Sequence, residues 1–316
     1  MISRVLVAGG TGRLGTLVVR GLASRGVDVR VMTRDPKRAA HLVGEGVEVV
    51  TGDVRDPVSV TSAVAGVDAA VSALHGFAGP GGVSPVTVDR DGNSHLIEAA
   101  RAAGAEVVLM SAVGAAPDSP FELFRMKHAA ETVLAASSVP STVVRCTAFV
   151  ELWFDLLVNT AGRSSRPLVF GRGHNPINFV SVRDVAALVE RVTTDQTTRG
   201  QTLEIGGPDD ITFDELARMV MAQRGSPLSP RHVPPVALHI MAATIGRLRP
   251  ELGRQARASL AMDQSDMTFC AGVNDARARF PDLPCTSPAE ALRGLREVEQ
   301  EPDHPTTNHP TTGRLT

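Results

Sequence analysis

The chain has 316 residues, of which 43% are hydrophobic and 21% charged, so it can bury a full core and has the composition of a globular protein. Its formal net charge of −2 gives no electrostatic basis for binding nucleic acid or an anionic membrane surface. The cysteines, Cys146, Cys270 and Cys285, are far apart and lack metal-ligand spacing, which predicts a reduced intracellular protein with no metal site. No leader-like segment precedes the first apolar run and no run is long enough for a bilayer, so we expect a cytoplasmic protein.

The first half of the chain alternates short apolar runs with helical patterns. Strands are predicted at Arg4–Ala8, Val27–Thr33, Val47–Thr51, Ala69–Ala73, Val107–Ser111 and Ser141–Arg145. Helices are predicted at 13–24, 36–44, 57–65, 87–103 and 120–137. This alternation predicts an α/β fold, a doubly wound parallel sheet of the Rossmann type with helices on both faces.

Several helix starts have clear signals. Asp35 and Asp56 each precede a proline, which predicts an N-cap followed by proline at the first helical position. Residues 119–122 and 212–215 each begin with Ser or Thr and end with Glu, the pattern of a capping box. A helix capped at residue 119 would place Lys127 in its third turn.

The alternation of predicted strands and helices becomes less regular after residue 146. A helix is predicted near 148–160, followed by the stretch INFVSVRDVAALVERV, a strand at QTLEIGG and a helix at 213–224. We expect a dinucleotide-binding domain over 1–150 and a small substrate lobe over 151–296, interleaved with the last strands of the sheet. Residues 297–316 have a low-complexity polar composition, which predicts a disordered tail.

A glycine-rich loop follows the first predicted strand. The sequence VLVAGGTGRLG, residues 5–15, has glycines at 9, 12 and 15, and also the spacing Gly10-x-Gly12-x-x-Gly15. Glycines permit a sharp turn and a close approach of the backbone to a pyrophosphate, which the next helix binds at its N-terminus. The strand–loop–helix context predicts a dinucleotide site.

The residue after the second strand indicates which dinucleotide binds. Folds that prefer NAD have an acidic residue there for the ribose hydroxyl, whereas this chain has Arg34. A guanidinium can bind a 2′-phosphate. Lys37 and Arg38 on the next helical turn could add to the positive potential around that phosphate. We therefore expect NADP (as NADPH), with NAD less favoured. Asp53 could accept from the adenine amino group or act only as a turn residue.

These features resemble the NmrA-like, atypical branch of the short-chain dehydrogenase/reductase family over roughly residues 3 to 225. The segments that carry the resemblance are GGTGRLG, the TR pair, GDVRD, DGNSHLIEAARAAG, VVLMSAVGA, FRMKHAAETVLAASSVPSTVVRCTAFVE, FVSVRDVAALV and LEIGGPDDITFDELA. The family includes NADP-dependent reductases of quinones, enone-like and benzylic ether substrates, and members that bind the dinucleotide without turnover. The resemblance implies cofactor contacts at Gly9, Thr11, Gly12, Arg13, Leu14, Gly15, Arg34, Lys37, Asp53, Val54, Ala73, Leu74, Ser111 and Lys127.

The chain departs from the family pattern at three positions. Leu123 occupies the position of the catalytic tyrosine, four residues before Lys127, and the chain contains no tyrosine. Ser111 is the single hydroxyl at the end of the fifth strand, where the family often has a pair of serines. Cys146 stands where the family usually has proline. These departures argue against tyrosine-mediated ketoreduction, epimerisation or dehydration.

Lys127 lies on one helical face with Leu123, Ala130 and Leu134. In the resembling reductases this lysine contacts the nicotinamide ribose, and in some it acts as the acid or base. Desolvation would lower its pKa and allow proton transfer near neutrality. The alternative is an exposed i,i+4 pair with Glu131, of a few tenths of a kcal/mol. We favour the cofactor role, for positioning more than for proton transfer.

The other candidates are weaker. His75 and Ser111 are possible catalytic residues, and His75, His174 and Phe149 are possible substrate contacts, although ordinary loop histidines explain both imidazoles equally well. Asn93 is expected to be structural, and Asp184 is expected to cap or tether a helix. The leading hypothesis is an NADPH-dependent reductase of a small apolar quinone, activated double bond or carbonyl. The alternative is a non-catalytic NADP(H)-binding sensor or regulatory protein. Either would be a monomer or a homodimer.

Overall fold

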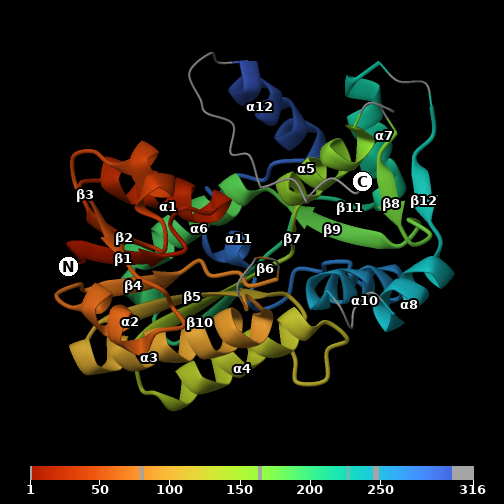
Figure 1. The fold of residues 1–316 in the computed structure, drawn as a ribbon. Helices are drawn as coiled ribbons and strands as arrows, with labels where there is room; N and C mark the ends of the chain where they lie inside the picture. Colours follow the sequence, from red (N-terminus) through yellow and green to blue (C-terminus); the bar gives the residue numbers. More distant parts are fainter. Residues whose placement is uncertain are drawn as a thin grey trace.

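The structure is a computed structural model that describes residues 2–77, 79, 82–162, 166–225, 228–244 and 249–300. Its centre is a seven-stranded parallel sheet in the order β10-β6-β5-β4-β1-β2-β3 (Figure 1). The strands are β1 (Arg4–Ala8), β2 (Asp28–Thr33), β3 (Val47–Thr51), β4 (Ala69–Ser72), β5 (Glu106–Ala112), β6 (Ser141–Cys146) and β10 (Gln201–Ile205). The predicted Rossmann fold is confirmed, and the strand order reverses between β1 and β4.

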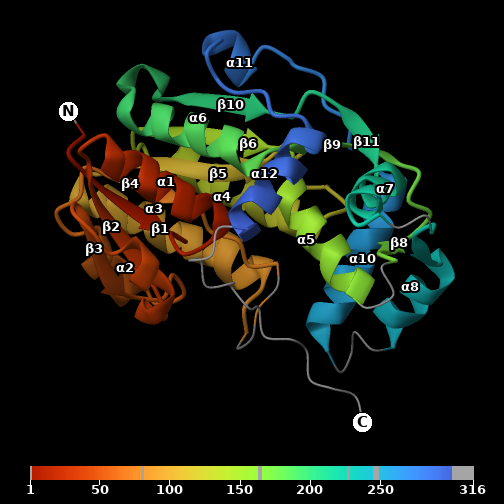
Figure 2. The same ribbon diagram turned by 90° about the horizontal axis from the view of Figure 1, so that it is seen from above.

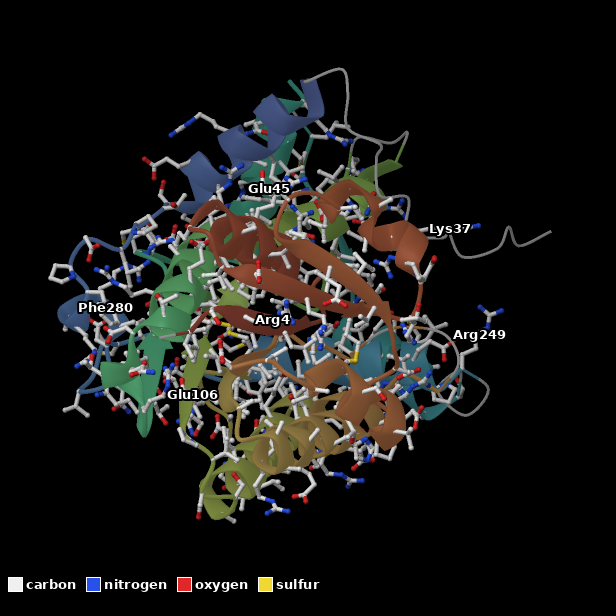
Figure 3. All side chains as sticks on the ribbon, turned by 90° about the vertical axis from the view of Figure 1, so that its left-hand side faces the viewer. Arg4, Lys37, Glu45, Glu106, Arg249 and Phe280 are labelled. Atoms are coloured by element: carbon white, nitrogen blue, oxygen red, sulfur yellow. The ribbon has the colours of Figure 1, made fainter. Side chains whose placement is uncertain are left out.

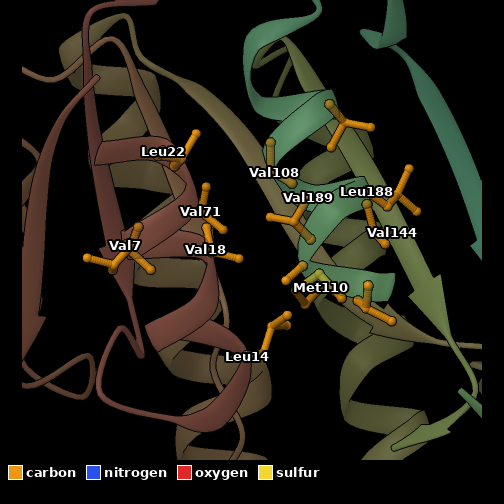
Figure 4. Close-up of a cluster of buried hydrophobic side chains, with 14 of the residues drawn as sticks. Val7, Leu14, Val18, Leu22, Val71, Val108, Met110, Val144, Leu188 and Val189 are labelled. Carbon is orange, nitrogen blue, oxygen red and sulfur yellow. The ribbon is translucent and has the colours of Figure 1, made fainter. Parts of the chain in front are cut away.

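Helices cover both faces of this sheet (Figure 2). One face carries α1 (Arg13–Ser24), the 3-10 helix η1 (Pro36–Leu42) and α6 (Val182–Thr194). The other carries α2 (Pro57–Val64), α3 (Asp91–Ala103) and α4 (Glu122–Ala136). Figure 4 shows Val18 of α1 and Val189 of α6 on facing sides of their helices in the first of these cores, with Leu188 on the side of α6 nearer Val144.

The apolar run of β1 shows why the sheet is buried on both sides. Val5 and Val7 pack into the core under α1 and α6, and Leu6 and Ala8 pack into the opposite core. All four residues are 0% exposed. A strand with alternating side chains and two covered faces must be apolar at every position, as this one is.

The helix caps agree with the sequence signals except at α4. Asp35 and Asp56 each accept from a backbone N–H two residues later, and the capping box at 212–215 is present. The predicted box at 119–122 is wrong, because α4 begins at Glu122 with Phe121 as its N-cap. Phe121 is buried in a core cluster of the lobe, and this packing decides where the helix begins.

Two helical segments differ from α-helix. The segment predicted at 36–44 is the short 3-10 helix η1. The helix predicted at 87–103 begins earlier, as the π-helix η2 (Pro85–Arg90), and continues as α3. A π-turn changes the direction in which side chains project, and such turns are frequent at functional sites.

The later elements form a lobe beside the carboxyl ends of the strands (Figures 1 and 2). They are β7 (Ala148–Phe149), α5 (Val150–Ala161), β8 (Leu168–Phe170), β9 (Pro176–Val180), β11 (Asp210–Thr212), α7 (Phe213–Gln223), β12 (Arg231–Val233), α8 (Pro235–Ala243), α10 (Pro250–Gln264) and α12 (Pro288–Gln300). Two short elements stay with the main sheet: η4 (Gln196–Thr198), which bonds to β6, and α11 (Ala276–Arg279), which packs into the core under α1 and α6. Small sheets join β11, β9 and β7, and β12 and β8. The helix α12 includes the first residues of the predicted tail, and 301–316 lie outside the described residues. Every described helix is too short or too polar to cross a bilayer.

Candidate active site

The glycine loop connects β1 to α1 and lies against β4. Gly9 has φ +86°, and a Cβ there would lie 2.5 Å from the carbonyl oxygen of Ala73. A Cβ at Gly15 would overlap the carbonyl oxygen of Gly9. Gly12 is the N-cap of α1 and has no side chain to accept from the first N–H groups of the helix. These N–H groups remain available to a ligand. These features fit a bound pyrophosphate.

The end of β2 presents the basic residues predicted to contact the ribose. Arg34 and Lys37 are exposed, and Lys37 projects away from the fold (Figure 3). The Asp53 carboxylate accepts from the backbone N–H of Arg55 at 3.0 Å and from its guanidinium at 2.6 Å. Its hydrogen bond to the Arg55 side chain lowers the pKa of Asp53, burial opposes this, and the charge of Arg34 contributes a smaller lowering. Asp53 therefore acts as a turn residue here, and its contact with adenine stays a prediction.

Lys127 is buried at the carboxyl ends of β4 and β5. Its Nζ donates to the carbonyl oxygens of Leu74 at 2.8 Å and Met110 at 3.0 Å. The same Nζ lies 2.9 Å from Oδ1 of Asp89, an ion pair that lacks hydrogen-bond geometry. The two side chains are 7% and 0% exposed. The alternative pairing of Lys127 with Glu131 is wrong, since Glu131 accepts from Arg145 instead.

Asp89 is a residue that sequence reasoning missed. It lies in η2, and its Oδ2 accepts from the backbone N–H of Gly76 at 2.8 Å. Asn93, four residues later, donates from Nδ2 to the Asp89 carbonyl at 2.6 Å and accepts from the Ser72 hydroxyl. Asn93 is therefore structural, as expected. The sequence did contain a signal for Asp89: it lies four residues before Asn93, on a helical face expected to be buried. Buried polar groups need hydrogen-bond partners inside the protein.

His75 and Ser111 each follow, in the chain, a residue whose carbonyl oxygen accepts from Lys127. Burial lowers the pKa of His75, with the Asp89 charge opposing and the Lys127 charge adding to the effect. His75 is nevertheless exposed to solvent, and water moderates these effects. Ser111 is 4% exposed, and its hydroxyl has no hydrogen-bond partner in the described part of the chain. Its carbonyl accepts from the Cys146 thiol at 3.6 Å.

The substrate candidates separate in space. Phe149 and Ala73 are partly buried and pack against the same hydrophobic core. Phe149 therefore lies at the carboxyl end of the sheet. His174 lies elsewhere, with Nε2 3.6 Å from the carboxylate of Asp214 on α7. His232 contacts the same carboxylate at 2.8 Å. The structure thus brings His75, Ser111 and Lys127 together and leaves His174 in another cluster.

Two hollows lie away from these residues. One is lined by charged side chains at the amino ends of β1, β2 and β3, where Arg4 pairs with Asp28. The other is a small apolar gap in the lobe, bordered by Trp153 and Phe213. Ligands of doubly wound sheets bind outside the carboxyl ends of the strands, near the reversal of strand order. The glycine loop and Lys127 meet this condition, and neither hollow does.

Comparisons with known proteins agree with this geometry. An NAD(P)H azoreductase of Xenophilus azovorans is 29% identical over 228 residues, which are 71% of this chain and 75% of the relative. A photosystem II assembly factor of a Synechocystis strain is 26% identical over 245 residues, which are 75% of this chain and 73% of the relative. An NADPH-dependent quinone oxidoreductase of Escherichia coli, crystallised with NADPH, has a TM-score of 0.73 at 22% identity and covers 92% of this chain and 99% of its own.

The family model described as NAD(P)H-binding matches residues 9–196, more than half of the chain. The chain therefore belongs to the NAD(P)H-binding family, and the resemblance to NmrA-like short-chain dehydrogenases/reductases is confirmed. The family model gives NAD(P)H as the cofactor of this chain.

Proposed function

We propose that this protein transfers a hydride from NADPH to a small apolar quinone, and that its own side chains donate no proton in that step. The bound cofactor supplies the hydride. The observation that carries the proposal is the bonding of Lys127, whose ammonium group donates to two carbonyl oxygens and is ion-paired with one carboxylate. Leu123 offers no hydroxyl in place of the usual tyrosine. A quinone needs little acid assistance, because its reduced oxygens can take protons from water.

The chain's own residues act mainly by positioning. Lys127 holds the loop after β4 against β5 and directs its charge at the place expected for the nicotinamide ribose. The pKa of His75 is lowered by burial, which favours the neutral imidazole, and the N–H of that form can donate a hydrogen bond to a substrate oxygen. The Ser111 hydroxyl, which is buried and unpaired within the described residues, can make a second such bond.

The test is NADPH oxidation with matched acceptors, followed by the loss of reduced-nicotinamide absorbance. We expect menadione to be reduced at least ~100-fold faster than acetophenone, because ketone reduction depends on general acid catalysis of about that size. Comparable rates with both acceptors would contradict the proposal, since they would require a proton donor in the site. The azoreductase and quinone oxidoreductase names of two similar proteins support this choice of acceptors.

A non-catalytic sensor is the second candidate. The missing tyrosine and the two hydrogen bonds and ion pair that hold Lys127 favour it, and one similar protein is an assembly factor. A sensor requires very different affinities for NADPH and NADP⁺ in the absence of substrate. Calorimetric titration with each form measures this difference. Strong discrimination, together with no turnover of any acceptor, would favour the sensor over the reductase.

A further inference from the structure

We propose that Arg254 on α10 binds an oxyanion group carried by the substrate, so that the preferred substrates are apolar molecules bearing a carboxylate, sulfonate or phosphate. The inference rests on the proposed function, because it concerns the substrate of the same site. Arg254 is partly buried and donates from Nη2 to the carbonyl oxygen of Val83 at 3.2 Å. Its Nε is buried and has no hydrogen-bond partner among the described residues.

The bonding of Arg254 differs from that of other inward-facing arginines. Arg30, Arg145, Arg199 and Arg277 have side chains that are 12%, 25%, 13% and 19% exposed, and each pairs with a carboxylate. No carboxylate pairs with Arg254 among the described side chains, which end at residue 295. The internal segments outside the described ranges, 78, 80–81, 163–165, 226–227 and 245–248, contain no Asp or Glu. A buried donor without a partner costs free energy, which an oxyanion would recover.

The location of Arg254 connects it to the active site. Val83 precedes Ser84, and Ser84 lies so close to Gly76 that a Cβ on Gly76 would overlap its carbonyl oxygen. Gly76 follows His75 directly and is held by Asp89. Arg254 of the lobe therefore bonds to the segment that packs against the His75 loop. A guanidinium at this place would bind an oxyanion at one end of a molecule whose other end lies near His75.

Two probes of the same shape test this without turnover. Naphthoate carries the anion and naphthamide is its neutral counterpart, and calorimetry measures the binding of each to the protein loaded with NADP⁺. We expect naphthoate to bind about 10- to 100-fold more tightly. Arg254→Gln should abolish this preference. Arg257→Gln, which removes an exposed charge from the same helix, should preserve it.

Other outcomes have definite meanings. Equal binding of the two probes, no binding of either, or a preference that survives Arg254→Gln would overturn the inference. If Arg254→Gln does not fold, Arg254→Lys keeps the charge but lacks the guanidinium fork and should reduce the preference severalfold; an unchanged preference in that variant would also overturn it. Charge-selective binding without reduction of menadione would overturn the reductase proposal alone, because the calorimetric measurement requires no turnover.

Discussion

Asp89 and Lys127 form a buried ion pair, and each charge is tolerated because the other is present. Removing one partner leaves the other unpaired in a low-dielectric environment, with a typical cost of about 3–5 kcal/mol. We therefore expect Asp89→Asn and Lys127→Met each to lower the free energy of unfolding by about that amount, measured by urea denaturation.

The double variant Asp89→Asn/Lys127→Met provides the control for this prediction. It removes both charges, so it should recover at least half of the loss seen in either single variant. Glu98→Gln, which breaks an exposed pair with Arg101, should leave the denaturation midpoint unchanged. Fully additive losses in the double variant would show that the pair does not account for the effect.

Arg34 provides a prediction on cofactor choice. It is exposed at the end of β2, so its replacement leaves the core intact. Arg34→Ala should weaken NADPH binding about 10- to 100-fold, because a charge-assisted bond to the 2′-phosphate is lost. NADH lacks that phosphate, and its affinity should not change. Fluorescence titration with both dinucleotides measures the two effects, and equal losses would refute the NADP assignment at this residue.

Cys146 provides a prediction about pH. Burial raises the pKa of its thiol to about 12, although the nearby Lys127 charge opposes the rise. The folded protein thus keeps a proton that the unfolded chain releases. The resulting stability is complete below the ordinary thiol pKa and is lost as the pH rises toward about 12.

Reactivity follows from the same shift in pKa. At about pH 8 the Cys146 thiolate is scarce, and iodoacetamide should modify the exposed Cys270 and Cys285 first. Mass spectrometry of peptides from the native protein, labelled over time, measures the three rates. Labelling of Cys146 as fast as that of Cys285 would contradict the raised pKa, and labelling in denaturant shows that all three thiols are intact.

At the scale of elements, α5 is tied to the cofactor loop. Asp155 in α5 pairs with Arg13, the first residue of α1, and the two side chains are 44% and 41% exposed. Exposed ion pairs contribute little to stability, so the main effect of Asp155 is to neutralise part of the Arg13 charge. Asp155→Asn would free that charge for the pyrophosphate. We expect NADPH to bind about 2- to 5-fold more tightly, measured by titration, with an unchanged melting midpoint. Weaker binding would mean that Asp155 supports the loop instead.

At the scale of the whole molecule, the lobe and the sheet are interlocked. The chain leaves the sheet after β6, builds part of the lobe and returns to the sheet as β10. Asp184 of α6, which is 0% exposed, then accepts from Arg277 at 3.0 Å and from the hydroxyl of Thr286 at 2.6 Å. The expectation that Asp184 tethers an element is confirmed.

This interlocking predicts a single unfolding transition. The one tryptophan, Trp153, lies in the lobe, and far-UV circular dichroism reports on the whole fold. The urea transitions followed by Trp153 fluorescence and by dichroism should coincide. A fluorescence transition at lower urea would show that the lobe unfolds separately, as the division at residue 150 would allow. Asp184→Ala should shift both curves together.

The sequence by itself determined the strands, the glycine loop and most helix starts of this protein. These features depend on neighbouring residues: alternating apolar side chains, glycines where a Cβ would clash, and caps such as Asp35 and Asp56 that bond within two residues. The missing tyrosine was equally visible, because it is a property of composition.

Only the tertiary structure decided the partners of the buried charges. Asp89 reaches Lys127, which lies 38 positions later in the chain, Arg254 reaches the loop before η2, and Phe121 displaces the predicted start of α4. Such contacts form between residues far apart in the chain, so local pattern does not specify them. They depend on which surfaces come together when the sheet and the lobe pack. Burial in that packing decides which partner each charged group or aromatic ring contacts.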